Sequence, residues 1–312
     1  PVGPLSSVML EAFWVPGTWD ARVAPFAAVG TPYSAPLPEV FFPALRINTP
    51  AKEMASSRWG VRLQGMSGAN LNWSVGHYKT YLDQPALRAV VDQSKLMQVG
   101  DDKLLTSLDA LLLEGSFPSV QVTGASMSFF DEITNTVFRG EIAWFWDEPV
   151  FIPEINTPLI PLPIQIPGLP GLPANGTIPK KNMLKWMIGL DKNFWIRPLN
   201  PTKTFFVSCQ YFGTWVEDYD DRMRQPLALY PDSDRYPLVK EVENLFTGAI
   251  STEYLHGDLV PTVAIFYDVR GAWLVNPMVN YIFEPFRFMI QYTSVMGNFT
   301  GIGAFGEQDD RA

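Results

Sequence analysis

The chain has 312 residues, of which 47% are hydrophobic, 13% aromatic and only 18% charged. Intrinsic disorder is excluded, because disordered chains combine low hydrophobicity with high charge. A net charge of −9 argues against a nucleic-acid partner, since phosphate binding depends on clustered Lys and Arg. One cysteine and two histidines exclude a disulfide framework and leave little for a metal site, and no cofactor is expected.

Apolar residues recur with a period of two along most of the chain, which is typical of β-strands. The segment 182–191 shows this most cleanly, with large apolar residues at its even positions, Leu184, Trp186, Ile188 and Leu190. No run of 18 or more uninterrupted apolar residues occurs, so a membrane-spanning helix is not expected. The pattern predicts eleven strands, near residues 8–15, 57–65, 69–81, 118–130, 136–146, 182–191, 203–214, 242–255, 259–269, 272–282 and 286–296.

The connections between these predicted strands alternate between long and short. The long ones cover 16–56, 82–117, 147–181 and 215–241, and 270–271 is the one short link where a long one is due. Outer-membrane barrels have short periplasmic turns and long external loops. A soluble β-sandwich has no reason to sort its loops by length. The alternation therefore favours an all-β fold, an antiparallel transmembrane β-barrel with long external loops.

Two of the long connections have a pattern of their own. Nine prolines interrupt 147–181, which predicts an extended external loop. This loop either packs rigidly on its neighbours or folds over the mouth and offers apolar side chains to a ligand. Within 82–117, the leucines of Asp101–Gly115 recur at helical spacing and predict a short helix. That helix would cap the rim, plug the lumen or dip into the outer leaflet.

The two faces of the predicted strands differ in the way that a membrane barrel requires. Large apolar residues would meet lipid, while small and charged residues would line a hydrated lumen. In a sandwich core, Gly60, Gly140 and Gly189 would instead leave holes. The lumen would form either a constriction that selects solutes or a salt-bridge network that fills the bore. The lumen candidates are Arg58, Arg62, Gln64, Arg139, Glu141, Lys185, Arg287 and Gln291.

Aromatic residues gather at the ends of the predicted strands. Trp and Tyr prefer the membrane interface, because the ring is apolar while the N–H or O–H stays hydrated. Aromatic packing across a soluble sheet is the alternative. The interface candidates are Trp73, Trp146, Trp195, Trp215 and Trp273.

Two stretches of the chain are similar to a known family. Leu184–Gly213 reads LKWMIGLDKNFWIRPLNPTKTFFVSCQYFG, and Val122–Ser126 (VTGAS) is followed by Arg-Gly-Glu at Arg139–Glu141. These motifs resemble a family of Gram-negative outer-membrane proteins catalogued as a domain of unknown function, over about residues 57–312. The resemblance implies an outer-membrane β-barrel and brings no catalytic residues. Members are often encoded beside a periplasmic lipid-binding-like protein and a resistance-nodulation-division exporter, which implies handling of lipids or other hydrophobic compounds.

These observations predict a single outer-membrane barrel domain over 1–312, in contact with outer-membrane lipids. Eleven strands do not close an even-stranded barrel, so we expect part of a barrel of about 14–16 strands. The predicted function is a channel or transporter for small, hydrophobic or amphipathic molecules, and not an enzyme. The candidate partners are the periplasmic lipid-binding protein and the exporter, and the oligomeric state is not predicted.

Two other functions stay open. One is a structural or adhesive barrel that binds partners through its loops. A bore blocked by side chains would favour this function over that of a channel. The other is a barrel hydrolase, which would need a Ser and a His within hydrogen-bond reach. The candidate pairs for it are Ser74 with His77 and Ser251 with His256, and neither pair has a hydrolase motif.

Overall fold

The computed structural model describes residues 5–17, 45–68, 70–82, 86–91, 97–99, 102–104, 111–150, 178–220, 223 and 240–297. Most of these residues lie in β-strands. Two short 3-10 turns, η2 (Met54–Ser56) and η7 (Leu255–Gly257), are the helical elements of the described part. The predicted all-β class is therefore confirmed.

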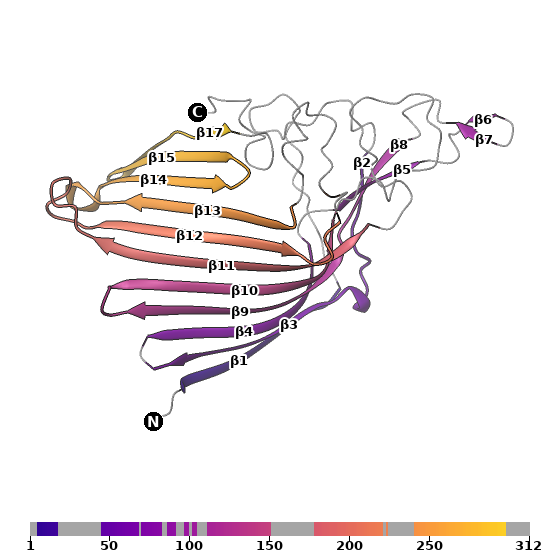
Figure 1. Cartoon of the computed structure of the whole chain (residues 1–312), viewed down its shortest axis with the longest axis horizontal. Coiled ribbons are helices and arrows are strands. Elements are labelled where there is room, and N and C mark those ends of the chain that lie inside the picture. Colours follow the sequence, from indigo (N-terminus) through magenta and orange to yellow (C-terminus); the bar gives the residue numbers. More distant parts are fainter. Residues whose placement is uncertain are drawn as a thin grey trace.

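Twelve strands form one antiparallel sheet, and their order across the sheet follows their order in the chain (Figure 1). β17 pairs with β15 beside β16. Every other strand of this sheet pairs with the strands of the same sheet that come before and after it in the chain. All eleven predicted strands are therefore present, and the last of them is divided in two. The strands are β1 (Leu5–Val15), β3 (Arg58–Ser67), β4 (Leu71–Tyr81), β9 (Ser119–Asp131), β10 (Thr136–Pro149), β11 (Lys180–Phe194), β12 (Phe205–Val216), β13 (Val242–Ser251), β14 (Leu259–Asp268), β15 (Ala272–Phe283), β16 (Phe286–Gln291) and β17 (Ser294–Gly297).

The sheet is curved, as Figure 1 shows, but it is not closed within the described residues. β1 pairs only with β3, while β16 and β17 form the other edge and pair only with β15. Long antiparallel sheets twist and curl because each strand has a right-handed twist. The antiparallel β-sheet is thus confirmed, and closure into a barrel stays a prediction.

The predicted alternation of connections is present. At one end, the turn end, short segments join β3 to β4, β9 to β10, β11 to β12, β13 to β14 and β15 to β16. At the other end, the loop end, the main-sheet strands are separated by many residues, except that Val269–Gly271 joins β14 to β15. The turn after β9 shows the local chemistry: Asp131 accepts hydrogen bonds from the backbone and hydroxyl of Thr134, and Asn135 has a positive φ of 50°.

Two small sheets lie within the long connections. β2 (Leu45–Asn48), β8 (Leu111–Ser116) and β5 (Ala86–Val91) form one of them, and β6 (Met97–Val99) pairs with β7 (Asp102–Leu104) in the other. The helix predicted for Asp101–Gly115 is wrong where the chain is described, because β7 and β8 occupy it. β8 pairs with β2 and β5 from distant parts of the chain, and this pairing overrides the helical spacing of the leucines. Residues 105–110 and 151–177 lie outside the described residues, so the predicted Pro-rich loop stays a prediction.

Few apolar side chains are buried in the described part. One cluster consists of Val150, Met183, Val216 and Met223, at the loop end of β10–β12. In contrast, exposed fractions reach 69% for Leu10 and 77% for Ile290. A β-sandwich encloses its large apolar residues between two sheets, whereas here most of them lie on an open face.

Candidate membrane surface and polar face

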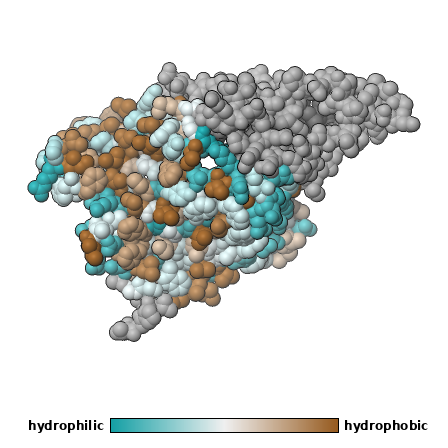
Figure 2. Space-filling view, in the orientation of Figure 1, coloured by the Kyte–Doolittle hydropathy of each residue, from teal (hydrophilic) through white to brown (hydrophobic). Residues whose placement is uncertain are grey.

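The register of the main sheet assigns each strand residue to one of two faces, because side chains alternate along a strand and paired residues share a face. We call the side that includes Ile188 the apolar face, and the opposite side the polar face. Hydrophobic residues gather in Figure 2 over the region where β13–β15 lie in Figure 1. At mid-strand the apolar face carries Leu10, Leu63, Val75, Ala125, Ile142, Ile188, Cys209, Gly248, Ile265, Val275 and Val279.

Aromatic residues border this aliphatic middle at both ends of the strands. The loop-end belt consists of Trp14, Trp59, Trp144, Trp146, Trp215, Tyr267 and Trp273. The turn-end belt consists of Trp73, Phe129, Phe138, Phe194, Phe205, Tyr281, Phe283, Phe286 and Phe288. Four predicted interface residues lie in these belts, namely Trp73, Trp146, Trp215 and Trp273.

The fifth predicted interface residue, Trp195, lies just after β11 at the turn end. It is 53% exposed, and the Arg197 guanidinium lies 5.8 Å from the centre of its ring. This is the distance of a cation–π contact. Trp195 is therefore placed at the strand end but outside the sheet.

From Trp59 to Trp215, the loop-end belt forms a series of ring contacts that also includes His77. The ring of His77 lies between those of Trp59 and Trp146, with centroid distances of 5.3 Å and 5.9 Å. Trp144 continues the series, at 6.5 Å from Trp146 and 6.2 Å from Trp215. These spacings lie within or near the roughly 4.5–7 Å range of favourable aromatic pairs.

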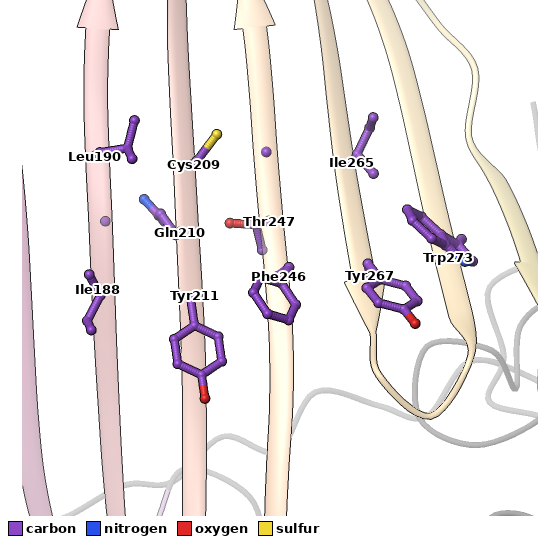
Figure 3. A pocket seen from close by; sticks show the side chains of 12 residues that line it. Ile188, Leu190, Cys209, Gln210, Tyr211, Phe246, Thr247, Ile265, Tyr267 and Trp273 are labelled. Carbon is purple, nitrogen blue, oxygen red and sulfur yellow. The ribbon is translucent and has the colours of Figure 1, made fainter.

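A hollow of about 460 Å³ lies on the apolar face over β11–β15 (Figure 3). One side is a row of stacked rings, in which Tyr267 and Trp273 are 4.1 Å apart. Gly248 leaves the middle open, since an added Cβ would meet only the Ser208 carbonyl, at 4.0 Å. The Tyr211 hydroxyl donates to Asn244 Oδ1 at 2.6 Å, so this ring borders the hollow with its polar group already satisfied.

Ion pairs cross neighbouring strands on the polar face. Arg62 on β3 pairs with Glu11 on β1 at 2.5 Å, and Gln64 donates to the same carboxylate at 3.2 Å. These contacts use side chains that share a face, and they hold the strands in register.

The same arrangement recurs between β10 and β11. Arg139 Nη2 lies 2.7 Å from an Asp191 carboxylate oxygen, and Lys185 Nζ lies 2.7 Å from Glu148 Oε1. Arg62, Gln64, Arg139 and Lys185 are thus the lumen candidates that the structure brings into cross-strand pairs. The pairing residues Glu11, Asp191 and Glu148 were missed, because only the register reveals them.

The remaining four lumen candidates also lie on the polar face. Arg58 is opposite Val15, while Arg287 and Gln291 are on the edge strand β16, opposite Ile282 and Met278. Glu141 is exposed between Ser126 and Met187. Within the described residues, Glu141 has no ion-pair partner.

A cluster at the loop end was not predicted from the sequence. Arg270, in the turn after β14, binds Asp268 at 2.5 Å and Glu243 at 3.4 Å. Burial disfavours the charged guanidinium, but hydrogen bonds to Asp268 and the charge of Glu243 outweigh this effect and raise the pKa of Arg270. Glu243 and Asp268 come together only through the pairing of β13 with β14.

The first of the two hydrolase pairs does not form. Ser74 lies on the polar face, where its hydroxyl is 2.8 Å from that of Ser126, while His77 lies on the apolar face. Within the described ranges, no group of three or more His, Cys, Asp or Glu could hold a metal ion. The same residues include no helix long and apolar enough to cross a membrane.

The chain matches no family model, and no curated protein matches it. The family resemblance of Leu184–Gly213 and Val122–Ser126 therefore stays a prediction.

Proposed function

We propose that the main sheet is the wall of an outer-membrane β-barrel that passes small hydrophobic or amphipathic molecules along its polar face. The observation that carries the proposal is the exposure of large aliphatic side chains at mid-strand, 50% for Ile142 and 60% for Ile188. Soluble proteins rarely expose a contiguous apolar surface of this kind. Since about half of each such side chain is exposed, hydrocarbon contact would stabilise it by roughly 1–1.5 kcal/mol relative to water.

Strand length and the aromatic belts also support membrane contact. The strands from β1 to β15 in the main sheet have 10 to 15 residues each. A tilted strand needs about 9–11 residues to cross a bilayer. Aromatic residues at both ends of an apolar band are typical of outer-membrane barrels.

The chemistry of the polar face supports amphipathic solutes. Its ion pairs would be hydrated in a lumen, but Met187, Phe212 and Leu245 are cross-strand neighbours on this same face. This apolar strip lies beside Lys185 and Thr214. A molecule with a polar head and an apolar body would contact both parts. The periplasmic lipid-binding protein and exporter would deliver or remove such a molecule.

The test is solute flux through the full-length protein in liposomes. We expect hydrocarbons or lipid analogues to cross faster than sugars of similar size, and protein-free liposomes give the baseline. Inserted protein without flux of any solute would instead favour the structural or adhesive barrel. Protein that does not enter liposomes at all would contradict the proposal.

A further inference from the structure

The apolar face carries a small polar group of side chains inside the loop-end belt. Lys79 on β4 lies opposite Trp59 on β3 and opposite Gln121 on β9. Gln121 in turn lies opposite Trp146 on β10. An ammonium and an amide are therefore flanked on both sides by tryptophans, on the face whose mid-strand residues are mostly aliphatic.

His77 supports this group from the mid-strand side. Its ring lies between Trp59 and Trp146, and its Nδ1 lies 2.7 Å from the Thr123 hydroxyl. The His77 ring thus contacts both tryptophans that flank the Lys79–Gln121 pair, and its hydrogen bond to Thr123 ties it to β9.

Within the part of the chain that the structure describes, no acidic side chain pairs with the charge of this group, which Lys79 carries. Lys192 lies on the same face at the turn end, but it has an acidic neighbour. Lys192 on β11 and Asp131 on β9 both lie opposite Thr136 of β10, and their opposite charges attract each other. Since the whole chain carries a net charge of −9, a general attraction to anions is not expected.

The available hydrogen-bonding groups are mainly donors. Lys79 offers three N–H bonds, Gln121 offers its amide NH₂, and each flanking indole has one N–H. A phosphate provides the matching acceptor oxygens and the opposite charge. Lysines beside a bilayer extend their ammonium group to the headgroup level, where tryptophan rings also lie.

We propose that Lys79 and Gln121, between Trp59 and Trp146, bind the phosphate of an anionic lipid headgroup in the leaflet at the loop end. The inference rests on the proposed function, because it requires the apolar face to contact a bilayer. Charge complementarity selects the lipid class, and the aliphatic residues toward mid-strand contact its acyl chains.

The test measures lipid selectivity of the full-length protein in phosphatidylcholine vesicles. Tryptophan quenching by brominated phosphatidylglycerol is compared with quenching by brominated phosphatidylcholine. We expect wild-type protein to prefer phosphatidylglycerol, and Lys79→Gln to lower this preference about fivefold. Lys79→Arg should keep the preference, and the matched control Lys192→Gln should leave it unchanged. Added inorganic phosphate should not compete, because it lacks the acyl chains.

Several results would overturn the inference. These are equal quenching by the two lipids in the wild type, an unchanged preference in Lys79→Gln, and an equal loss in Lys192→Gln. Vesicle flotation separates this failure from that of the proposed function. Protein that floats with vesicles but shows no preference contradicts only the headgroup site, whereas protein that does not float contradicts both.

Discussion

At the scale of single residues, Asn200 shows how one buried side chain joins two turns. It is fully buried, and its amide donates to the Thr252 hydroxyl at 2.9 Å and to the Glu253 carbonyl at 2.8 Å. Its Oδ1 accepts from the backbone N–H groups of Thr202 and Lys203. The turn after β11 is thereby tied to the turn after β13.

Asn200→Ala should lower the free energy of unfolding by about 1–3 kcal/mol, because buried partners lose their hydrogen bonds. Urea unfolding of the protein inserted in vesicles measures this change. Asn193→Ala, at an exposed position on the polar face, is the control and should change stability by less than about 0.5 kcal/mol. Equal effects at both positions would contradict the role of Asn200.

Two glycines of the apolar face should respond oppositely to substitution by alanine. Gly248→Ala should stabilise the protein by up to about 0.5–1 kcal/mol, since a Cβ fits in the hollow and glycine weakens a strand. Gly213→Ala should destabilise it, because the Trp186 ring occupies the space that an added Cβ would need. Thermal unfolding of both variants measures the difference, and a shift in the same direction for both would contradict this packing.

At the scale of elements, neighbouring residues of one strand face different surroundings. β11 places Ile188 on the apolar face and Met187 on the polar face, opposite Glu141. The period of two predicted this assignment, because strand geometry alone sets the alternation. The same reasoning failed for Asp101–Gly115, where pairing with distant strands decided the structure.

The substitutions Ile188→Arg and Met187→Arg test the two faces of β11. Arg at 188 should lower stability in a bilayer by about 2–4 kcal/mol, as expected for a charge facing lipid near mid-membrane. Arg at 187 should be milder, because it lies opposite the carboxylate of Glu141. The folded fraction after refolding into vesicles measures both. If the two variants assemble equally well, the sidedness is wrong.

At the scale of the whole molecule, the sheet separates two chemical environments. Cys209 is the single cysteine of the chain, and it is exposed on the apolar face at mid-strand. Gln210, the next residue, lies on the polar face opposite Gly189 and Thr247. These adjacent positions allow the surroundings of each face to be probed separately.

A water-soluble maleimide should react slowly with Cys209 after insertion into vesicles, because bilayer lipid would cover the thiol. The variant with Cys209→Ser and Gln210→Cys should react faster if the polar face is hydrated. Detergent-unfolded protein, in which both thiols are accessible, provides the reference rate. Rapid labelling of Cys209 in vesicles would contradict lipid contact.

By itself, the sequence determined the strands of the main sheet, the alternation of connection lengths and the residue types of each face, because these follow from local periodicity and turn chemistry. Only the tertiary structure decided which side chains meet across strands. The Arg62–Glu11 pair, the ties made by Asn200 and the placement of His77 between Trp59 and Trp146 all depend on register. Register is set by pairing between segments far apart in the chain, and no local pattern specifies which residue lies opposite which.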